Sequence, residues 1–149
     1  MNLSLLLPLS GIVLGGIFVA AQAPINASLA RALGDPLLAA GVSFGVGFLV
    51  LALVCVVRGS WPASGAIAAA PWWAWLGGVL GAFYVAIVIW AVPQLGAMST
   101  VAALIFGQVV AALLLDAVGG FGLPVQAITW QRLVAIAFIL GGLLLSRSG

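Results

Sequence analysis

Long apolar stretches alternate along the chain with short breaks that contain turn-forming or charged residues. Five of the stretches approach the roughly 20 apolar residues that a helix needs to cross a bilayer, and they cover residues 5–30, 36–57, 72–92, 96–118 and 130–145. The breaks carry Gly, Pro and Arg and lie at residues 31–35, 58–62, 93–95 and 119–124. The pattern predicts an all-α integral membrane protein with five transmembrane helices in a single domain over residues 1–149.

Composition agrees with this prediction and narrows the possible functions. The chain is 66% hydrophobic and 4% charged, whereas about 25% of residues are charged in an ordinary soluble domain. We therefore expect a lipid bilayer as its surroundings. A net charge of +2 without any basic face argues against a nucleic-acid partner. Because the chain has no His and a single Cys, we expect no metal site, no cofactor and no enzymatic activity.

An internal repeat relates the first two spans to the third and fourth. A shift of 62 positions aligns three short motifs, namely Leu14-Gly15-Gly16 with Leu76-Gly77-Gly78, Leu33-Gly34 with Leu95-Gly96, and Phe44-Gly45 with Phe106-Gly107. A unit of two helices returns the chain to the same side of the membrane, so the two halves would be parallel and the fifth helix would stand apart. The inverted symmetry that many transporters use would then require a second chain.

The positions of the four arginines do not favour one orientation of the chain in the membrane. Arg58 and Arg132 fall on the side of the N-terminus, and Arg31 and Arg147 fall on the other side. Insertion normally follows an excess of Lys and Arg in cytoplasmic loops. The equal division predicts a dual-topology protein that pairs with an inverted copy of itself. The small residues Gly141 and Gly142 make the fifth helix the candidate dimer contact.

The first span contains polar residues that are costly to place in lipid. At about 100° per residue they share one helix face with small and aromatic residues, and this face comprises Gly11, Gly15, Phe18, Gln22 and Asn26. Pro24 removes a backbone donor, frees a carbonyl one turn earlier and would permit the helix to bend. Two interpretations stay open for Gln22 and Asn26: they bind a substrate, or they only hold helices together by hydrogen bonds.

Other spans offer groups that could complete a polar and aromatic lining. The candidates are Ser43 in the second span, Trp73 and Tyr84 in the third, and Gln108 in the fourth. Asp116 is the acidic residue that lies inside an apparent span, which makes it a candidate for coupling to an ion. An equally weighted interpretation is a structural ion pair between Asp116 and Arg132 across the short loop.

Several of these motifs occur together in a known family. They are Gln22-x-Pro24-x-Asn26, Ser43-Phe44, Trp72-Trp73 followed by Gly77-Gly78-x-x-Gly81, Pro93-x-Leu95-Gly96, Gly107-Gln108 and Asp116. Through them the chain resembles, over nearly its whole length, the five-helix YdcZ-type branch of the drug/metabolite transporter superfamily. The resemblance implies a multi-pass protein of the bacterial inner membrane that acts as a dimer of inverted units, with a second copy or a paired homologue as partner. The first helix lacks the Glu of small multidrug transporters, so their proton-coupled export of cations is not implied.

The resulting prediction is a membrane transporter of a small organic solute. Gln22, Asn26, Ser43, Trp73, Tyr84 and Gln108 would line a cavity between two inverted copies, with alternating access from either face. The alternatives are an assembly or regulatory subunit that transports nothing, and one half of a heterodimeric transporter.

Overall fold

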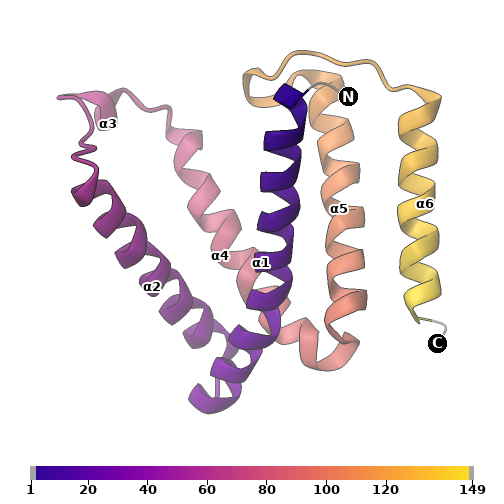
Figure 1. Ribbon diagram of the computed structural model, residues 1–149, viewed down its shortest axis with the longest axis horizontal. Helices are drawn as coiled ribbons and strands as arrows, with labels where there is room; N and C mark the ends of the chain where they lie inside the picture. Colours follow the sequence, from indigo (N-terminus) through magenta and orange to yellow (C-terminus); the bar gives the residue numbers. More distant parts are fainter. Residues whose placement is uncertain (1–2, 148–149) are drawn as a thin grey trace. The chain divides into compact units, whose positions relative to one another are not determined.

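All regular elements in the described part of the chain are helices. The computed structural model describes residues 3–147 (Figure 1). The long helices are α1 (Leu3–Leu33), α2 (Pro36–Val57), α4 (Leu76–Leu95), α5 (Ala97–Val118) and α6 (Trp130–Arg147). A short helix α3 (Ala66–Ala69) and two 3₁₀ turns, Trp72–Trp75 and Gly120–Gly122, lie in the connections. Five segments are long and apolar enough to cross a membrane, so the prediction of an all-α chain with five candidate spans is confirmed.

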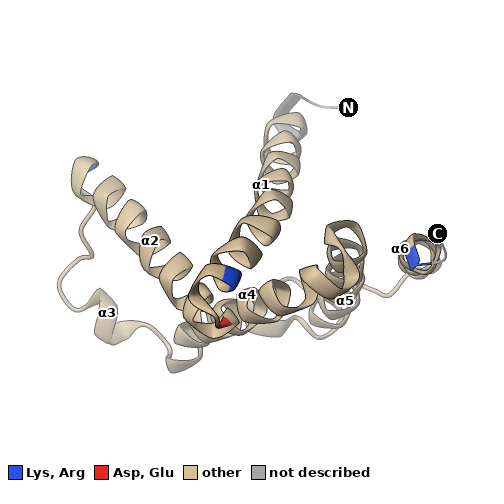
Figure 2. Cartoon of the chain, turned by 90° about the horizontal axis from the view of Figure 1, so that it is seen from below, with Lys and Arg blue, Asp and Glu red and all other residues tan. Residues whose placement is uncertain are grey.

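The surface of these helices suits hydrocarbon rather than water. Almost the whole ribbon in Figure 2 is uncharged. Each long helix exposes large apolar side chains, for example Ile12 of α1, Phe48 of α2, Leu80 of α4, Leu114 of α5 and Phe138 of α6. Soluble monomers rarely expose contiguous apolar patches of this extent, which indicates that lipid covers the helices.

The chain divides into two compact units, Met1–Gln94 and Leu95–Gly149. In the first unit, α1 and α2 are joined by a tight turn. Gly34 adopts φ +77°, a left-handed conformation that is costly for residues with a Cβ. Asp35 then caps α2 by accepting a hydrogen bond of 2.6 Å from the backbone N–H of Leu38, and Pro36 follows as the first helical residue.

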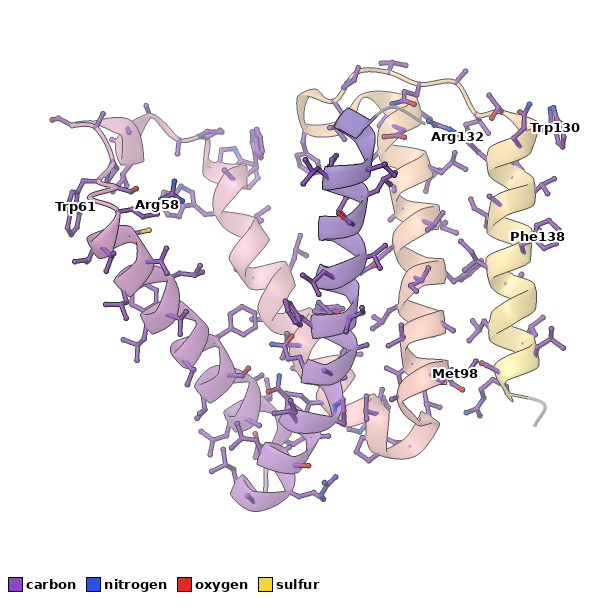
Figure 3. All side chains as sticks on the ribbon, viewed as in Figure 1. Arg58, Trp61, Met98, Trp130, Arg132 and Phe138 are labelled. Carbon is purple, nitrogen blue, oxygen red and sulfur yellow. The ribbon has the colours of Figure 1, made fainter. Side chains whose placement is uncertain are left out.

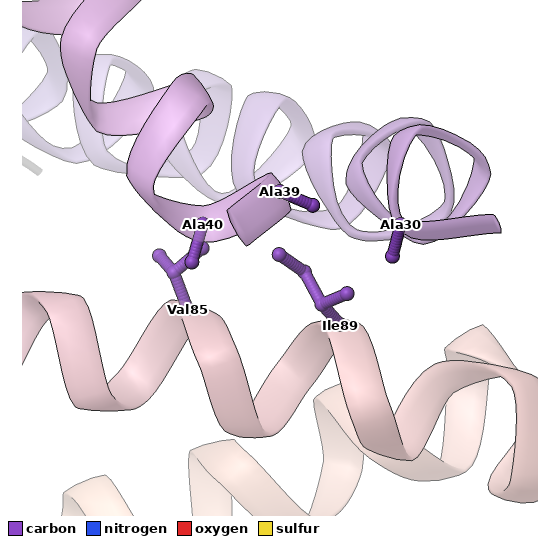
Figure 4. Close-up of a cluster of buried hydrophobic side chains, with 5 residues drawn as sticks. All are labelled: Ala30, Ala39, Ala40, Val85 and Ile89. Carbon is purple, nitrogen blue, oxygen red and sulfur yellow. The ribbon is translucent and has the colours of Figure 1, made fainter. Parts of the chain in front are cut away.

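Small residues at the α1–α2 turn let α4 pack closely against both helices. Ala30 of α1 and Ala39 and Ala40 of α2 form a buried cluster with Val85 and Ile89 of α4 (Figure 4). Ile89 is only 1% exposed and fills the space that the three alanines leave open. In lipid, helix association depends on such close van der Waals packing because there is little hydrophobic force between helices.

In the second unit, α5 and α6 lie side by side. The connection turns at Gly119, which caps α5 with φ +64°, and continues through an extended segment to Trp130. At the opposite end of the helix pair, the Ser99 hydroxyl donates to the backbone carbonyl of Ser146 at 3.3 Å. The two helices are therefore held by polar contacts at one end and by a glycine turn at the other.

One predicted helix boundary is wrong. The sequence placed a break at residues 93–95, but α4 continues through Pro93 to Leu95 and the break falls at Gly96, which has φ +78°. Pro93 lies in the last turn, where it removes a single hydrogen bond and has no further helix to distort. α1 and α6 extend a few residues beyond their predicted ends, α2 agrees with its predicted bounds, and α5 begins one residue later than predicted and ends as predicted.

Candidate functional site

The structure brings three of the predicted site residues together in the first unit. Gln22 and Asn26 of α1 and Tyr84 of α4 line one small pocket. Gln22 and Asn26 are four residues apart and therefore lie one above the other on the same helix face. Tyr84 comes from the face of α4 that carries Val85 and Ile89 of the buried cluster, which holds the phenol near the two amides.

Asn26 is the most deeply placed polar side chain of this pocket. It is only 6% exposed, whereas Gln22 is exposed. No hydrogen bond from Gln22, Asn26 or Tyr84 side chains to another described residue is found, and no fully enclosed side-chain polar atom is left unsatisfied in the described part of the chain. The nearly buried side chain of Asn26 thus lines the pocket with hydrogen-bonding groups that no described residue satisfies.

The rest of the pocket wall is apolar. Val19, Ala23, Val85, Val88 and Ile89 complete it. The pocket measures about 10 Å³, which is close to the smallest space that holds one water molecule. In the single chain this pocket has room for about one water molecule and is too small for an organic solute.

Pro24 lies between Gln22 and Asn26 inside an unbroken α1. Because proline has no N–H, the carbonyl of Ala20 loses its intrahelical partner. The Ser28 hydroxyl donates to the carbonyl of Pro24 at 3.0 Å and accepts a hydrogen bond of 2.7 Å from Arg31. Polar groups therefore continue from the pocket along α1 toward its C-terminal end.

The other three predicted lining residues lie elsewhere. Ser43 is half-buried on α2 and does not line the pocket of Gln22 and Asn26. Trp73 belongs to the 3₁₀ turn before α4 and is 39% exposed. Gln108 is exposed on α5, in the second unit. Their assignment to a substrate cavity stays a prediction.

Asp116 pairs with Arg132, as one of the two interpretations of this residue expected. Arg132 Nη1 lies 3.2 Å from Asp116 Oδ2, and the two side chains are 33% and 30% exposed. The second guanidinium nitrogen, Nη2, donates to the side-chain carbonyl of Gln126. The backbone N–H of Gln126 donates to the Asp116 carbonyl at 2.8 Å. This network connects the loop to the ends of both helices. Whether Asp116 serves to hold the helices or to couple an ion stays a prediction.

Gly141 and Gly142 open a groove on α6. The groove is about 480 Å³ and is bounded by residues of this one helix, namely Val134, Ala137, Phe138, Gly141, Gly142 and Leu145. Phe138 points away from α5 (Figure 3). A Cβ added at either glycine would meet nothing within 4 Å in this chain. The small residues are therefore not required for packing inside the chain.

Sequence reasoning missed the apolar residues of the pocket wall. Val85, Val88 and Ile89 are buried, but they lie in a helix that is apolar on all sides. Without polar residues to contrast with them, periodicity cannot distinguish a buried valine from one that faces lipid. The spacing of Val85, Val88 and Ile89 from Tyr84 was the one available signal.

Comparison with known proteins places the chain in a family. Residues 7–145 match the family described as "Putative inner membrane exporter, YdcZ". The chain is 33% identical over 76 residues to the inner membrane protein YdcZ of Escherichia coli (strain K12). That alignment covers 51% of this chain and 51% of the relative, so it spans about half the length of each. No solved structure matches the chain.

Proposed function

The chain belongs to the YdcZ-type family of multi-pass inner-membrane proteins, and from this premise we propose that it transports a small organic solute across that membrane. The observation that carries the proposal is the convergence of Gln22, Asn26 and Tyr84 on one pocket. Placing polar side chains in a membrane interior costs free energy. These three side chains also have no hydrogen-bond partner inside the described chain. A ligand that provides such partners is the best explanation.

The chemistry of the pocket suggests what kind of solute it binds. Two amides and a phenol donate and accept hydrogen bonds without carrying charge. The surrounding valines and Ile89 offer apolar contact. This combination suits a neutral molecule with a polar, hydrogen-bonding group and an apolar part. It does not suit a permanent cation, because no carboxylate lines the pocket.

We propose that a second, inverted copy of the chain completes the cavity. The pocket of one chain is about 10 Å³, whereas small-molecule sites are typically about 300–1,000 Å³. Gln22 is exposed and would face the partner. The α6 groove around Gly141 and Gly142 offers small residues for close helix approach between subunits. The even division of arginines would allow both orientations to insert.

Alternating access follows from this arrangement. Two inverted copies present the same cavity wall from opposite sides, so exchanging their conformations opens the cavity to the other face. Pro24 gives α1 a point at which it can bend without breaking a hydrogen bond of its own N–H. Movement of α1 about Pro24 would carry Gln22 and Asn26 relative to Tyr84 and widen the pocket.

Ligand binding tests the proposal. Purified wild-type protein is screened by thermal shift against neutral solutes that combine an amide or hydroxyl with an apolar group. A ligand found in this way should lose at least about tenfold in affinity when Asn26→Leu or Tyr84→Phe removes a hydrogen-bonding group. Gln131→Leu is the control, since it removes an exposed amide of α6 that does not line the pocket. If a ligand binds the Asn26→Leu and Tyr84→Phe variants as tightly as wild type, the pocket is not its site.

A further inference from the structure

Another groove lies between α5 and α6 and belongs wholly to the second unit. It is about 230 Å³ and is lined by Val109, Ala112, Leu113, Asp116, Arg132, Ala135 and Ile136. The α5 residues follow the i, i+3, i+4, i+7 spacing of one helix face, and the α6 residues follow the same rule from Arg132. The cavity is therefore a groove along the seam of two neighbouring helices.

The groove has a charged end and an apolar end. Asp116 lies in the last turn of α5 and Arg132 lies in the first turn of α6, so both mark the level at which the helices leave the apolar region. Figure 3 shows Arg132 at the loop end of α6. From this pair the groove runs toward Val109 and Ile136, deeper in both helices. Ala112 and Ala135 keep it open between these ends.

The charged end retains unused hydrogen-bonding capacity. Of the five N–H donors of a guanidinium, Arg132 uses two in hydrogen bonds to other described residues, one to Asp116 and one to Gln126. In the described residues, Oδ2 is the side-chain oxygen of Asp116 that accepts a hydrogen bond. Both side chains are about one-third exposed, at 33% and 30%. A ligand that carries a negative and a positive group could bind both charges without breaking the pair.

We propose that this groove binds one phospholipid with an ethanolamine head group. The phosphate accepts hydrogen bonds from Arg132, the primary ammonium donates to the free oxygen of Asp116, and an acyl chain follows the groove past Ala112 and Ala135. Basic pockets between transmembrane helices are known to hold lipid head groups. The carboxylate selects among lipids: it repels a purely anionic head group, and a choline head group has no N–H to donate.

The shape of the groove also favours a lipid over a transported solute. The groove of about 230 Å³ is an open seam along two helices and not an enclosed pocket, so part of an acyl chain can lie in it while the rest stays in the bilayer. Its long axis follows the helices, which is the direction of acyl chains in a bilayer. The proposed lipid would bridge α5 and α6 beside the ion pair and so stabilise the second unit, whether or not the first unit transports a solute.

Native mass spectrometry of the full-length protein in detergent tests this proposal. The protein is delipidated and titrated with phosphatidylethanolamine, phosphatidylcholine or phosphatidylglycerol of identical acyl chains. We expect one phosphatidylethanolamine per chain to bind at least about tenfold more tightly than either of the other lipids. Equal binding of the three lipids by the wild-type protein would overturn the proposal, and this result needs no variant.

Three variants, one of them a control, locate the site. Ala112→Leu fills the groove without touching a charge, and it should lower phosphatidylethanolamine affinity at least about tenfold. Ala111→Leu is the matched control, because the neighbouring Ala111 is exposed and does not line the groove. Asp116→Asn removes the negative charge and should shift the preference from phosphatidylethanolamine to phosphatidylglycerol. Ala112→Leu protein that is folded by circular dichroism and binds phosphatidylethanolamine like wild type would contradict the assigned groove.

Discussion

The turn between α5 and α6 offers the sharpest quantitative prediction, because two of its glycines share a positive φ and differ in their surroundings. Gly119 has φ +64° and Gly122 has φ +84°. A Cβ in the left-handed region costs roughly 1–2 kcal/mol. At Gly119 the new Cβ would also lie 2.8 Å from Val125 Cγ2 and 3.1 Å from the carbonyl oxygen of Leu123. At Gly122 it would meet nothing within 4 Å.

These contacts set the expected magnitudes. Overpacking of this kind costs about 1–3 kcal/mol. We therefore expect Gly119→Ala to lower the free energy of unfolding by about 2–5 kcal/mol and Gly122→Ala by about 1–2 kcal/mol. In the double variant Gly119→Ala with Val125→Ala, part of the loss should be recovered because the closest atom, Cγ2, is gone. Val125 is itself exposed, so its truncation alone should change little.

Equilibrium unfolding in mixed detergent micelles, followed by circular dichroism at the helix band, measures these differences. The two single variants and the double variant are compared at matched protein and detergent concentrations. Equal losses for Gly119→Ala and Gly122→Ala would show that the Val125 contact is absent in the membrane protein. The position of the loop, and with it the alignment of Asp116 with Arg132, would then need revision.

Three further predictions concern the ion pair, the orientation and the dimer. Because the Asp116–Arg132 pair is only partly exposed, Asp116→Asn should cost about 1 kcal/mol of stability while leaving the pH dependence of any transport unchanged; a folded variant that loses only proton-driven accumulation would refute this. Adding two Lys beside Arg58 should fix one orientation and abolish homodimer function. A copy with the opposite charge bias should restore that function. Thiol-labelling that finds one orientation in the unmodified protein would contradict dual topology. Gly141→Leu should weaken the dimer in cross-linking and light scattering while each chain still folds, because a Cβ added at this position would meet no atom of another described segment within 4 Å.

The sequence was sufficient to predict those features that depend on polar residues within an apolar span. Gln22 and Asn26 are separated by one helical turn in a span without charge, so their common face could be predicted from their spacing alone. The structure buries only the Asn26 end of that face in the single chain, since Gly11, Gly15 and Phe18 are all exposed. What packs against these three residues depends on contacts outside the chain, and helical periodicity does not predict such contacts.

Other features depended on three-dimensional details that have no local signal. An ion pair with Arg132 and a role in ion coupling were both compatible with the position of Asp116 at the end of a span. Arg132 comes within 3.2 Å of Asp116 because of the path that residues 119–129 take. Ile89 occupies the centre of the buried cluster, yet its neighbours in α4 are equally apolar. Pro93 indicated a helix end from composition alone, and the left-handed Gly96 three residues later marks the actual end.

The central claim is that the pocket of Gln22, Asn26 and Tyr84 lies on a transport pathway, and solute flux tests it most directly. Wild-type and Asn26→Leu protein are reconstituted at equal amounts into liposomes, and efflux of a solute identified by its binding is recorded under a downhill gradient. The account predicts that Asn26→Leu protein, verified as an intact dimer by cross-linking, loses most of this flux, whereas Gln131→Leu, which removes an exposed amide of α6 outside the pocket, keeps it. Wild-type flux through an assembled Asn26→Leu dimer would contradict the claim, as would wild-type protein that binds the solute and never carries it across.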